Sequence, residues 1–297
     1  MLTLSTNGQN DLRECPERYR LSHDCDGQGS RVRPLVETVP LRRGLQGHAG
    51  LEAWWISSTP LESMGAALKA YAEPDQHLKA LVKAMLVGYH VQWFSERSRY
   101  KVLGVEVPYE LPLIKSSYGE RVNRTGRMDA VVEVDDQLYV VEHKFTGGYI
   151  RDRVYWAALQ LNSQVSNYLD ACAELYGRNV AGVVYDVIGV PRLRAGDGEK
   201  PRAYFDRCCA TIMKAQADHY ERRTIVRLEH EAERARQDLG GTAHQLLMHY
   251  ETGLWPRNPV ACGRYGKDNA CAYLAICDGE TTMRNEKLYR IERKQNV

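Results

Sequence analysis

Near its middle the chain reads Gly126-Arg-Met-Asp-Ala-Val-Val-Glu-Val-Asp-Asp-Gln-Leu-Tyr-Val-Val-Glu-His-Lys144. Two short apolar runs within it, 130–134 and 138–142, predict a pair of strands. The residues between them, Asp135-Asp136-Gln137, favour a turn because short polar side chains can hydrogen-bond the local backbone. We therefore expect a hairpin at the centre of the fold, and the remaining elements are placed around it.

The hairpin brings several polar groups to one end of a sheet. Asp129 lies seven residues before Asp136 and Glu142 six residues after it, so an antiparallel pairing puts both carboxylates on about the same rung. Glu142 and Lys144 share a face, while His143 points away and leaves its carbonyl near them. Hard divalent cations such as Mg²⁺ bind a few carboxylates with waters and phosphate oxygens, and a lysine can balance phosphate charge or orient a water. The alternative is an exposed hairpin with an ordinary Glu/Lys strand pair.

Size and charge set few limits on the function. The 297 residues can bury a full core, as one large domain or one domain with an elaboration. The 40 basic and 38 acidic residues give a net charge of +2, so any nucleic-acid surface must be local. The sequence shows no signal-peptide pattern and no apolar run of 18 residues, which predicts an intracellular protein with no membrane partner.

The flanking segments predict a mixed α/β core. An alternating strand at 102–113 precedes the hairpin by one polar loop and makes a three-stranded meander with it. A helix at 152–176, stopped by Gly177, and a β-rich run at 180–190 follow as a strand-helix-strand connection. Further helices are expected from residue 39 onward, within 61–100, from 202 to 237 before Gly240-Gly241, and at 242–251.

Three polar residues on these helices are candidates for the same chemistry. His48 lies on the helix that begins near residue 39, and a neutral imidazole can complete a Mg²⁺ or Mn²⁺ site that already holds two carboxylates. Gln164 and Tyr168 are four residues apart and share one helix face. Each can hydrogen-bond a phosphate or a base. A lone histidine is more often a packing residue, and both other side chains can equally be half-buried polar residues of an amphipathic helix.

The two ends of the chain differ from its middle. A short helical or turn-like piece at 11–21 carries Cys15, so residues 1–30 are expected to form an arm. Proline and asparagine residues break regular structure near residue 256, and three cysteines follow, which separates 254–297 from a core at 31–253. Eight cysteines in an intracellular protein indicate metal binding or buried thiols more than disulfides. Three of them lie in helical context and are expected to be packing thiols: Cys172, Cys208 and Cys209.

The motifs follow one another in this order: Gly44 with His48, Gly126-Arg-Met-Asp129, Glu142-His-Lys144, and Gln164 with Tyr168. In this order they resemble the PD-(D/E)XK nuclease superfamily, in its RecB-like branch. Cys15, followed by proline, and the three C-terminal cysteines resemble the iron-sulfur subset, similar to CRISPR-associated and phage-encoded RecB-type exonucleases. The resemblance implies a restriction-endonuclease-like α/β fold, in which helices flank a mixed β-sheet core and an iron-sulfur cluster staples an N-/C-terminal helical subdomain.

The resemblance also implies a role for each residue of the site. His48, Asp129 and Glu142 look like the ligands of a Mg²⁺ or Mn²⁺ ion. The His143 backbone carbonyl looks like a further ligand, and Lys144 looks like the catalytic lysine. The implied reaction is hydrolysis of phosphodiester bonds by a metal-activated water.

The implied substrate is DNA, with single strands preferred. Gln164 and Tyr168 would position the scissile strand, and Glu106 matches an acidic residue on the preceding strand. Arg127 and Arg151 are part of a basic set that can neutralise phosphates, beside aromatic side chains that can stack unpaired bases; its other members are Arg42, Arg43, Arg97, Arg99, Lys101 and Arg153. The alternative for this set is a solvated charged surface. Exonuclease action from the 5′ side rests on the resemblance alone, and endonuclease action stays open.

The cysteine motif implies a cluster that ties the chain ends together. Cys15, Cys262, Cys271 and Cys277 would bind a [4Fe-4S] cluster, and a four-thiolate site can also hold tetrahedral zinc. Cys25 is the main rival to Cys15 as the fourth ligand. The five residues between Cys271 and Cys277 fit the family pattern, whereas the eight between Cys262 and Cys271 exceed its usual short gap.

Two further classes of function are compatible with the sequence. One is a non-catalytic DNA-binding component of a recombination or CRISPR adaptation complex, against which the intact set of Asp129, Glu142 and Lys144 argues. The other is a zinc-stapled structural protein with an incidental hairpin. The expected location is the cytoplasm of a bacterial, archaeal or phage-infected cell, and recombination or CRISPR adaptation proteins are the expected partners.

Overall fold

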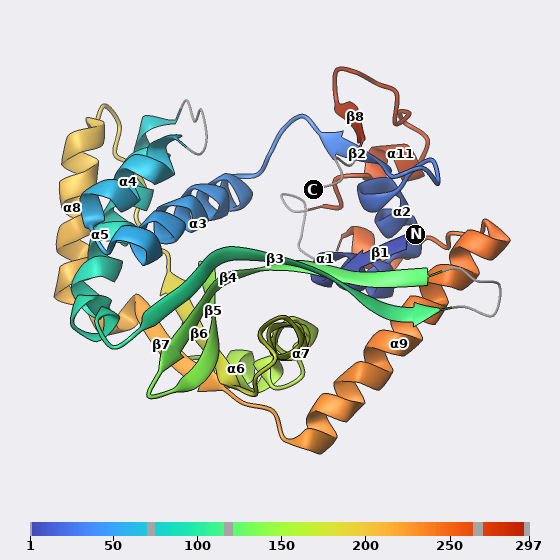
Figure 1. Cartoon of the computed structure of the whole chain (residues 1–297). Coiled ribbons are helices and arrows are strands. Elements are labelled where there is room, and N and C mark those ends of the chain that lie inside the picture. The colour runs from blue at the N-terminus through green and yellow to red at the C-terminus, as the bar shows by residue number, and fades with distance from the viewer. Residues whose placement is uncertain (1, 70–74, 116–120, 264–269, 294–297) are drawn as a thin grey trace. The chain divides into compact units, whose positions relative to one another are not determined.

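The computed structural model describes residues 2–69, 75–115, 121–263 and 270–293, which group into two compact units (Figure 1). Unit 1 comprises Met1–Glu37, Glu110–Gly126 and Glu233–Val297, and unit 2 comprises Thr38–Tyr109 and Arg127–Ala232. The expected N-terminal arm and cysteine-rich tail both fall in unit 1. The division into functional segments at residues 30 and 253 stays a prediction.

The sheet is mixed, as the sequence predicts. The strands are β1 (Leu2–Ser5), β2 (Ser30–Pro34), β3 (Lys101–Lys115), β4 (Arg121–Val134), β5 (Gln137–Thr146), β6 (Val180–Gly189), β7 (Tyr220–Ile225) and β8 (Tyr289–Arg293). Their order is β1-β4-β5-β6-β7, and β3 also pairs with β4. The β4–β5 and β6–β7 pairs are antiparallel, while β5–β6 and β1–β4 are parallel. Strands β2 and β8 form a separate antiparallel pair.

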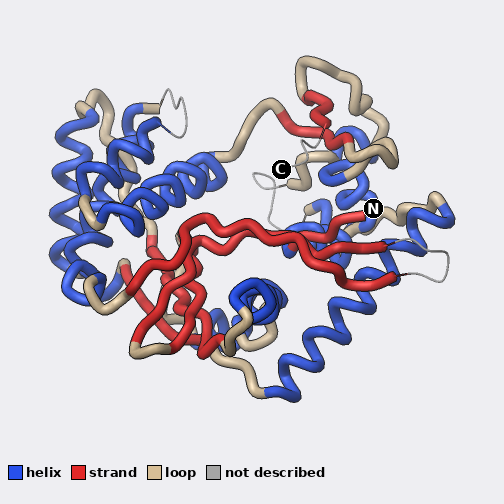
Figure 2. Tube along the Cα trace, viewed as in Figure 1, coloured by secondary structure: helices blue, strands red, loops and turns tan. Residues whose placement is uncertain are grey.

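Helices flank these strands, as Figure 2 shows in blue against the red strands. They are α1 (Thr6–Glu14), α2 (Pro16–His23), α3 (Val39–Ser57), α4 (Pro60–Lys69), α5 (Gln76–Arg97), α6 (Arg153–Leu159), α7 (Ser163–Tyr176), α8 (Pro201–Lys214), α9 (Glu229–Thr252), α10 (Pro259–Cys262) and α11 (Leu274–Cys277). None of the helices in the described ranges is both long and apolar enough to cross a membrane.

The main core of unit 2 lies between its sheet and the helices α3, α5 and α8. Buried aromatic and aliphatic side chains from both layers pack together there, among them Trp54, Met85, Ala130, Val184 and Ile212. Removing such surface from water is the main stabilising contribution to a fold of this kind. Figure 1 shows α6 and α7 on the opposite side of the same strands. The sheet of unit 2 is therefore covered on both faces, which explains the nearly continuous apolar sequence of β6.

Local sequence explains why the central hairpin and the following helix form. The turn residues Asp135 and Asp136 have φ of 50° and 60°, and two positive φ values make a turn whose twist matches that of the strands. Asn162 caps α7 by accepting a hydrogen bond from the backbone N–H of Gln164 at 2.7 Å. Gly177, with φ of 62°, ends the same helix in the left-handed conformation.

Several expected elements differ in the structure. The helix expected at 152–176 is two helices, α6 and α7, because the Asn162 cap starts a new one. The helix expected at 202–237 is α8 followed by strand β7, whose charged Glu-Arg-Arg interior hid its strand character. Helix α9 continues through Gly240 and Gly241, since buried side chains such as Leu239 and Leu246 hold it on both sides of the glycines. Strands β1, β2 and β8 were not expected.

Candidate active site

The β4–β5 register places Asp129 and Glu142 opposite each other. Ala130 pairs with Val141 and Val134 with Gln137, so one further step of the same register brings Asp129 to Glu142. The expectation that both carboxylates reach one rung is confirmed in this sense. Lys144 follows two residues later on β5 and is exposed to solvent.

Glu142 is a buried carboxyl group with an unsatisfied oxygen. The residue is 4 % exposed, and its Oε2 atom has no hydrogen-bond partner among the described residues. Burial raises the pKa of Glu142 well above its usual value, and the negative charge of Asp129 raises it further, while Lys144 opposes the shift. A buried carboxylate without a partner is costly, and a divalent cation between two carboxylates removes that cost. The site therefore fits a hard cation.

Asp129 is held in one orientation by three contacts from two histidines, His143 and His48. Its Oδ2 atom accepts hydrogen bonds from the backbone N–H of His143 at 2.8 Å and from His143 Nδ1 at 2.9 Å. Its Oδ1 atom lies 3.4 Å from His48 Nδ1. Burial alone would raise the pKa of Asp129, but the charge of His48 and the hydrogen bonds from both histidines outweigh it, so this pKa falls well below its usual range. Asp129 is therefore ionised at neutral pH.

His48 reaches the site from helix α3, and the nearby Asp129 carboxylate favours its protonated form. Burial lowers the pKa of His48, but the charge and hydrogen bond of Asp129 outweigh burial, and the net pKa is raised. The imidazole is partly exposed, at 35 % of its side chain, so it stands at the edge of the site. Together His48, Asp129 and His143 bring one potential ligand atom each to within 4.8 Å of one another.

The ring of His143 is already hydrogen-bonded on both sides. Its Nε2 atom receives the indole N–H of Trp55 at 2.8 Å, and its Nδ1 atom contacts Asp129. The side chain is 1 % exposed. A ring bonded in this way is better suited to hold a ligand than to be one, which leaves the backbone carbonyl as the predicted contribution of His143.

The two residues expected to position DNA stand beside Glu142. Gln164 Nε2 donates to the Tyr168 hydroxyl at 2.9 Å, and that hydroxyl donates to the Arg127 carbonyl at 2.7 Å. Tyr168 is only 4 % exposed, whereas Gln164 is half-buried. Both side chains counteract the rise in the pKa of Glu142. Both side chains therefore stabilise the ionised carboxylate of Glu142. Contact of either one with DNA stays a prediction.

The outer residues of the site include Glu106, which the sequence places on the preceding strand. Glu106 has φ of 50° within β3, a conformation that is uncommon for a residue with a side chain. Burial and the nearby Asp129 raise the pKa of Glu106, and Arg127 lies 3.4 Å from its carboxylate. Arg127 and Arg151 are both exposed, and Arg151 lies 3.5 Å from Glu221.

Four further residues near the site were missed by the sequence argument: Trp55, Tyr89, Asp186 and Arg222. Asp186 is 1 % exposed and lies in the apolar run of β6. A lone acidic residue within a buried strand requires a partner, because an isolated buried charge is unstable. That requirement is the signal in the sequence that could have identified Asp186.

The cysteines of the proposed cluster all lie in unit 1. Cys15 Sγ accepts a hydrogen bond from the backbone N–H of Asn258 at 3.4 Å, and the Cys271 N–H donates to the Cys262 carbonyl at 2.9 Å. Burial raises the pKa of the Cys271 thiol, and the thiols of Cys262 and Cys15 raise it further. Burial likewise raises the pKa of the Cys277 thiol, and the nearby Glu17, Cys271 and Cys15 raise it further. Cys271 and Cys277 are therefore each close enough to Cys15 for its charge to affect them.

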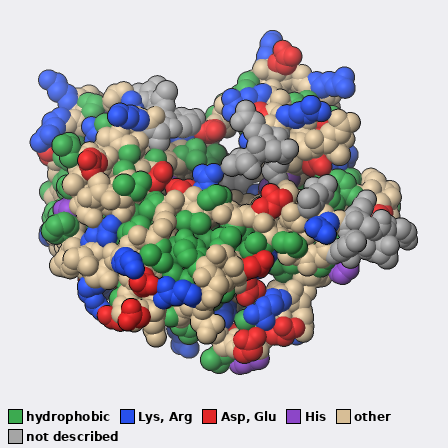
Figure 3. Space-filling view, in the orientation of Figure 1, with side chains coloured by type: hydrophobic (Ala, Val, Ile, Leu, Met, Phe, Trp, Pro, Cys, Tyr) green, Lys and Arg blue, Asp and Glu red, His purple; other side chains and the backbone are tan. Residues whose placement is uncertain are grey.

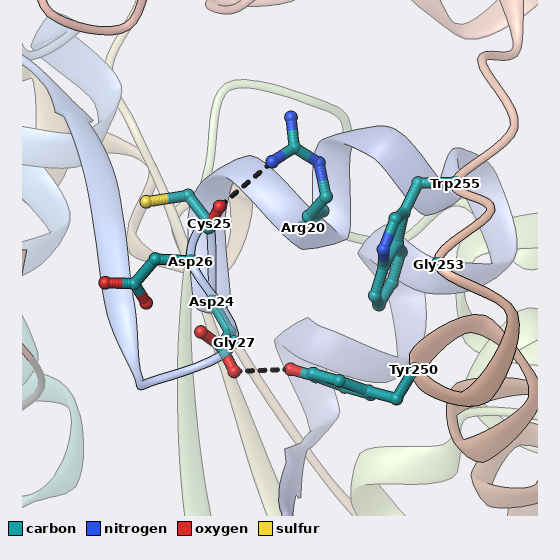
Figure 4. Close-up of a pocket in the computed structure, with 8 residues that line it drawn as sticks. All are labelled: Arg20, Asp24, Cys25, Asp26, Gly27, Tyr250, Gly253 and Trp255. Atoms are coloured by element: carbon teal, nitrogen blue, oxygen red, sulfur yellow. Dashed lines mark hydrogen bonds between the residues drawn. The ribbon is translucent and has the colours of Figure 1, made fainter.

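Cys25 belongs to the same region. It packs in a small core cluster with partly buried Cys271 and Cys277, and it also lines a pocket of about 410 Å³ (Figure 4). In that pocket the Tyr250 hydroxyl donates to Asp24 at 2.6 Å, and Arg20 donates to the Cys25 carbonyl at 3.0 Å. Cys25 therefore remains an alternative to Cys15 as a ligand.

Comparisons with known proteins bear on the fold and the family of this chain. A structure described as a "Putative exonuclease" from Eubacterium rectale aligns with a TM-score of 0.50 and 9 % identity, over 88 % of this chain and 85 % of that one, which shows a shared fold. The structure of SSO0001 aligns at 13 % identity over 81 % of this chain and 86 % of that one, but its TM-score of 0.37 supports no argument. No curated protein sequence matches the chain.

The family comparison covers nearly the whole chain. The sequence model described as the PD-(D/E)XK nuclease superfamily matches residues 3–278. That range contains both strands of the hairpin and all four cysteines of the proposed cluster. The mixed sheet flanked by helices agrees with this match. The chain belongs to the PD-(D/E)XK nuclease superfamily.

Proposed function

We propose that this protein is a divalent-metal-dependent nuclease that degrades single-stranded DNA from its ends. One observation carries the proposal: the buried Glu142 carboxyl, with an unsatisfied oxygen, stands opposite ionised Asp129 and two residues before exposed Lys144. An ordinary charged sheet edge would leave Glu142 in solvent. The family supports nuclease chemistry, while the preference for DNA ends and single strands rests on the resemblance to RecB-type exonucleases and on the name of the Eubacterium rectale protein.

Four groups would hold Mg²⁺ or Mn²⁺ in this proposal. They are the carboxylates of Asp129 and Glu142, the His48 imidazole and the His143 backbone carbonyl. A cation bound there supplies Lewis acidity toward a water and neutralises charge on the phosphate. Glu142 must lose any proton it holds to bind the cation, whereas Asp129 is already ionised.

Lys144 has a separate role. Side chains alternate along β5, so the ammonium of Lys144 lies on the same face as Glu142, and Lys144 is exposed where Glu142 is buried. From that position it can donate hydrogen bonds to a non-bridging phosphate oxygen, whose negative charge increases as the water attacks, or it can orient that water. Glu142 would hold the cation while Lys144 holds the phosphate.

DNA binding would be local to the site. Figure 3 shows basic and acidic side chains interspersed over the visible face, in line with the net charge of +2. Arg127 and Arg151 are exposed cations near the hairpin and can contact phosphates. Gln164 is partly accessible and can reach a nucleotide, while buried Tyr168 would act through Gln164 and the Arg127 carbonyl.

The four cysteines would bind a [4Fe-4S] cluster that stabilises unit 1. The same four thiolates can also hold tetrahedral zinc. Protein purified without oxygen should absorb light at about 400 nm, as iron-sulfur proteins do. A colourless protein that carries stoichiometric zinc would contradict the cluster.

The nuclease proposal is tested with end-labelled linear and circular single strands in the presence of Mn²⁺. The wild type should degrade linear strands and spare circles, and Lys144→Ala should lose cleavage while it keeps its melting temperature. Lys214→Ala, which removes an exposed lysine at the end of α8, is the matched control and should cleave normally. Undiminished cleavage by Lys144→Ala would refute the catalytic assignment. DNA binding without cleavage under any metal would indicate instead an assembly component of recombination or CRISPR adaptation.

A further inference from the structure

A row of polar side chains crosses the sheet of unit 2 behind the candidate metal site. His143 on β5 pairs in register with Asp186 on β6, and Asp186 pairs with Arg222 on β7. Asp129 on β4 joins the row through its hydrogen bonds to His143. Four strands therefore contribute one polar residue each to a continuous line that ends at a predicted metal ligand.

The hydrogen bonds fix which nitrogen of His143 carries the proton. The indole N–H of Trp55 can only donate, and it points at His143 Nε2 from 2.8 Å, so Nε2 must accept. A neutral ring then carries its hydrogen on Nδ1. The Nδ1–H donates to Asp129 Oδ2 at 2.9 Å. His143 thus presents a fixed donor to Asp129.

The far half of the row holds the ring in place. The Tyr89 hydroxyl donates to Asp186 Oδ2 at 2.6 Å and lies 3.3 Å from His143 Nε2. Arg222 binds Asp186 through two nitrogens, with Nη2 to Oδ2 at 2.7 Å. Burial opposes the charge of Arg222, but Asp186 outweighs it and raises the pKa of Arg222 well above its usual value. The Asp186–Arg222 pair is therefore an ion pair.

Aromatic residues from α3 and α5 seal the row from water. Trp55, Tyr89 and Trp93 pack over it, and the Arg222 guanidinium lies 4.1 Å from the Trp93 ring centroid. The side chains of His143 and Asp186 are each 1 % exposed, and that of Arg222 is 9 % exposed. Hydrogen bonds in such a poorly hydrated setting are strong and have few alternatives.

We propose that this row positions Asp129 for cation binding, with His143 as a positioning residue whose side chain is not itself a ligand. Two donors of His143 occupy Oδ2 of Asp129, which turns Oδ1 toward His48 and leaves it for the cation. Outer partners of this kind orient a ligating carboxylate and commonly change metal affinity about 10–100-fold. The proposal rests on the proposed function only in that Asp129 binds a divalent cation.

The test compares two variants, each of which keeps the hydrogen-bonding function of one ring nitrogen of His143. His143→Asn places an amide nitrogen near the position of Nδ1 and can still donate to Asp129. His143→Gln places its amide near the position of Nε2, so it can still accept from Trp55 but loses the donor. His90→Asn is the matched control, because His90 accepts an indole N–H through Nδ1, from Trp54 at 3.1 Å, without touching the site, and the asparagine amide can keep that acceptor.

Mn²⁺ affinity, measured by calorimetry or by electron paramagnetic resonance in the absence of DNA, is the main readout. His143→Gln should bind Mn²⁺ about 10–100-fold more weakly than wild type, while His143→Asn and His90→Asn stay close to it. Melting temperatures of the apo proteins report any general damage. In wild-type protein, ¹⁵N spectroscopy should show His143 protonated on Nδ1 and not on Nε2.

The outcomes separate this inference from the nuclease proposal. Equal Mn²⁺ affinity of His143→Gln and wild type would overturn the inference, as would a ring protonated on Nε2 or a loss of affinity shared by His143→Asn. If wild type binds no Mn²⁺, or if Asp129→Asn binds it as well as wild type, the inference also fails. If wild type binds Mn²⁺ through Asp129 but cleaves no DNA, the nuclease proposal fails while the affinity pattern still tests the row.

Discussion

Gly47 on α3 lies directly against the ring of Phe145 on β5. A Cβ atom added to Gly47 would come within 2.2 Å of Phe145 Cζ, a distance that atoms do not occupy. The glycine therefore lets α3 approach the strand that carries Glu142 and Lys144. That approach puts the next residue, His48, 3.4 Å from Asp129 and 5.8 Å, between ring centroids, from Phe145.

Gly47→Ala should damage both stability and activity. The added methyl group must push α3 away from β5, and overpacking of this kind costs about 1–3 kcal/mol. Because His48 moves with the helix, nuclease activity should also fall. The expected loss is about 100-fold if the imidazole is displaced by about 1 Å. Thermal melting and Mn²⁺-dependent cleavage measure the two effects. Gly65→Ala on α4 is the control: its Cβ meets open space, so both quantities should stay near wild type.

Glu142→Gln should separate stability from function. The wild-type carboxyl is buried with an unsatisfied oxygen beside the negative charge of Asp129, so replacing it with a neutral amide removes repulsion. We expect the apo variant to melt above wild type. Wild type should gain about 2.7 kcal/mol of stability when Mn²⁺ is present at a hundred times its dissociation constant, and the variant should gain almost nothing. An apo variant that melts below wild type, with the Mn²⁺ gain intact, would contradict the assignment of Glu142 as a ligand.

The central hairpin could be predicted from sequence because its information is local. Two short apolar runs specify the strands, and the Asp135-Asp136 turn fixes their register, which in turn sets Asp129 opposite Glu142. The α/β class follows from the strand-helix-strand pattern after Lys144. These features need only the periodicity of side chains along one segment.

The remaining features depend on contacts between distant segments. The charged interior of strand β7 is typical of a helix surface, so the sequence predicts a helix there. Arg222 is buried in this strand because it pairs with Asp186 on β6. Likewise His143 was expected to point away from the site, yet the Asp129 carboxylate turns to meet its ring. No periodicity within one segment encodes a partner on another strand. Such positions are found only once the sheet order is known.

Breaking the Asp186–Arg222 pair should cost much more than breaking a surface pair. Asp186→Asn leaves the Arg222 guanidinium buried without its counter-charge, and removal of one partner of a buried pair costs about 3–5 kcal/mol. Chemical denaturation measures this change. Arg202→Ala, which removes a largely exposed pair with Asp206, should cost at most about 1 kcal/mol.

A double variant distinguishes charge from packing in this row. Asp186→Leu with Arg222→Met replaces the pair by apolar side chains, and such replacements are often neutral or stabilising. The double variant should therefore recover most of the stability that Asp186→Asn loses. It should still bind Mn²⁺ more weakly than wild type, because Tyr89 loses its acceptor and no longer supports the His143 ring. If the double variant loses as much stability as Asp186→Asn, the cost comes from packing and not from the unpaired charge of Arg222.

Thiol reactivity should separate packing cysteines from the cluster cysteines by its pH dependence. Burial raises the pKa of Cys209 to about 11 and that of Cys172 to about 12, so both stay protonated at pH 8. Only the thiolate is alkylated by iodoacetamide, and its fraction grows about tenfold per pH unit below the pKa. Partly exposed Cys209 should therefore react slowly at pH 8 and about 100-fold faster at pH 10, while fully buried Cys172 should stay unlabelled at both until the protein unfolds.

Mass spectrometry of the labelled peptides gives these rates residue by residue. Cys262, Cys271 and Cys277 are only partly buried, so in cluster-free protein they are sterically open to the reagent, and in cluster-loaded protein their sulfurs are occupied. Protection of these three on loading, with no change at Cys209, would place the cluster in unit 1. A rise of only about fourfold in the Cys209 rate between pH 8 and pH 10 would show an ordinary thiol pKa of about 8.5 and contradict the effect of its burial. Cys15 and Cys25 are both buried and are therefore compared by substitution. Loss of the cluster absorbance in Cys25→Ser but not in Cys15→Ser would identify Cys25 as the fourth ligand.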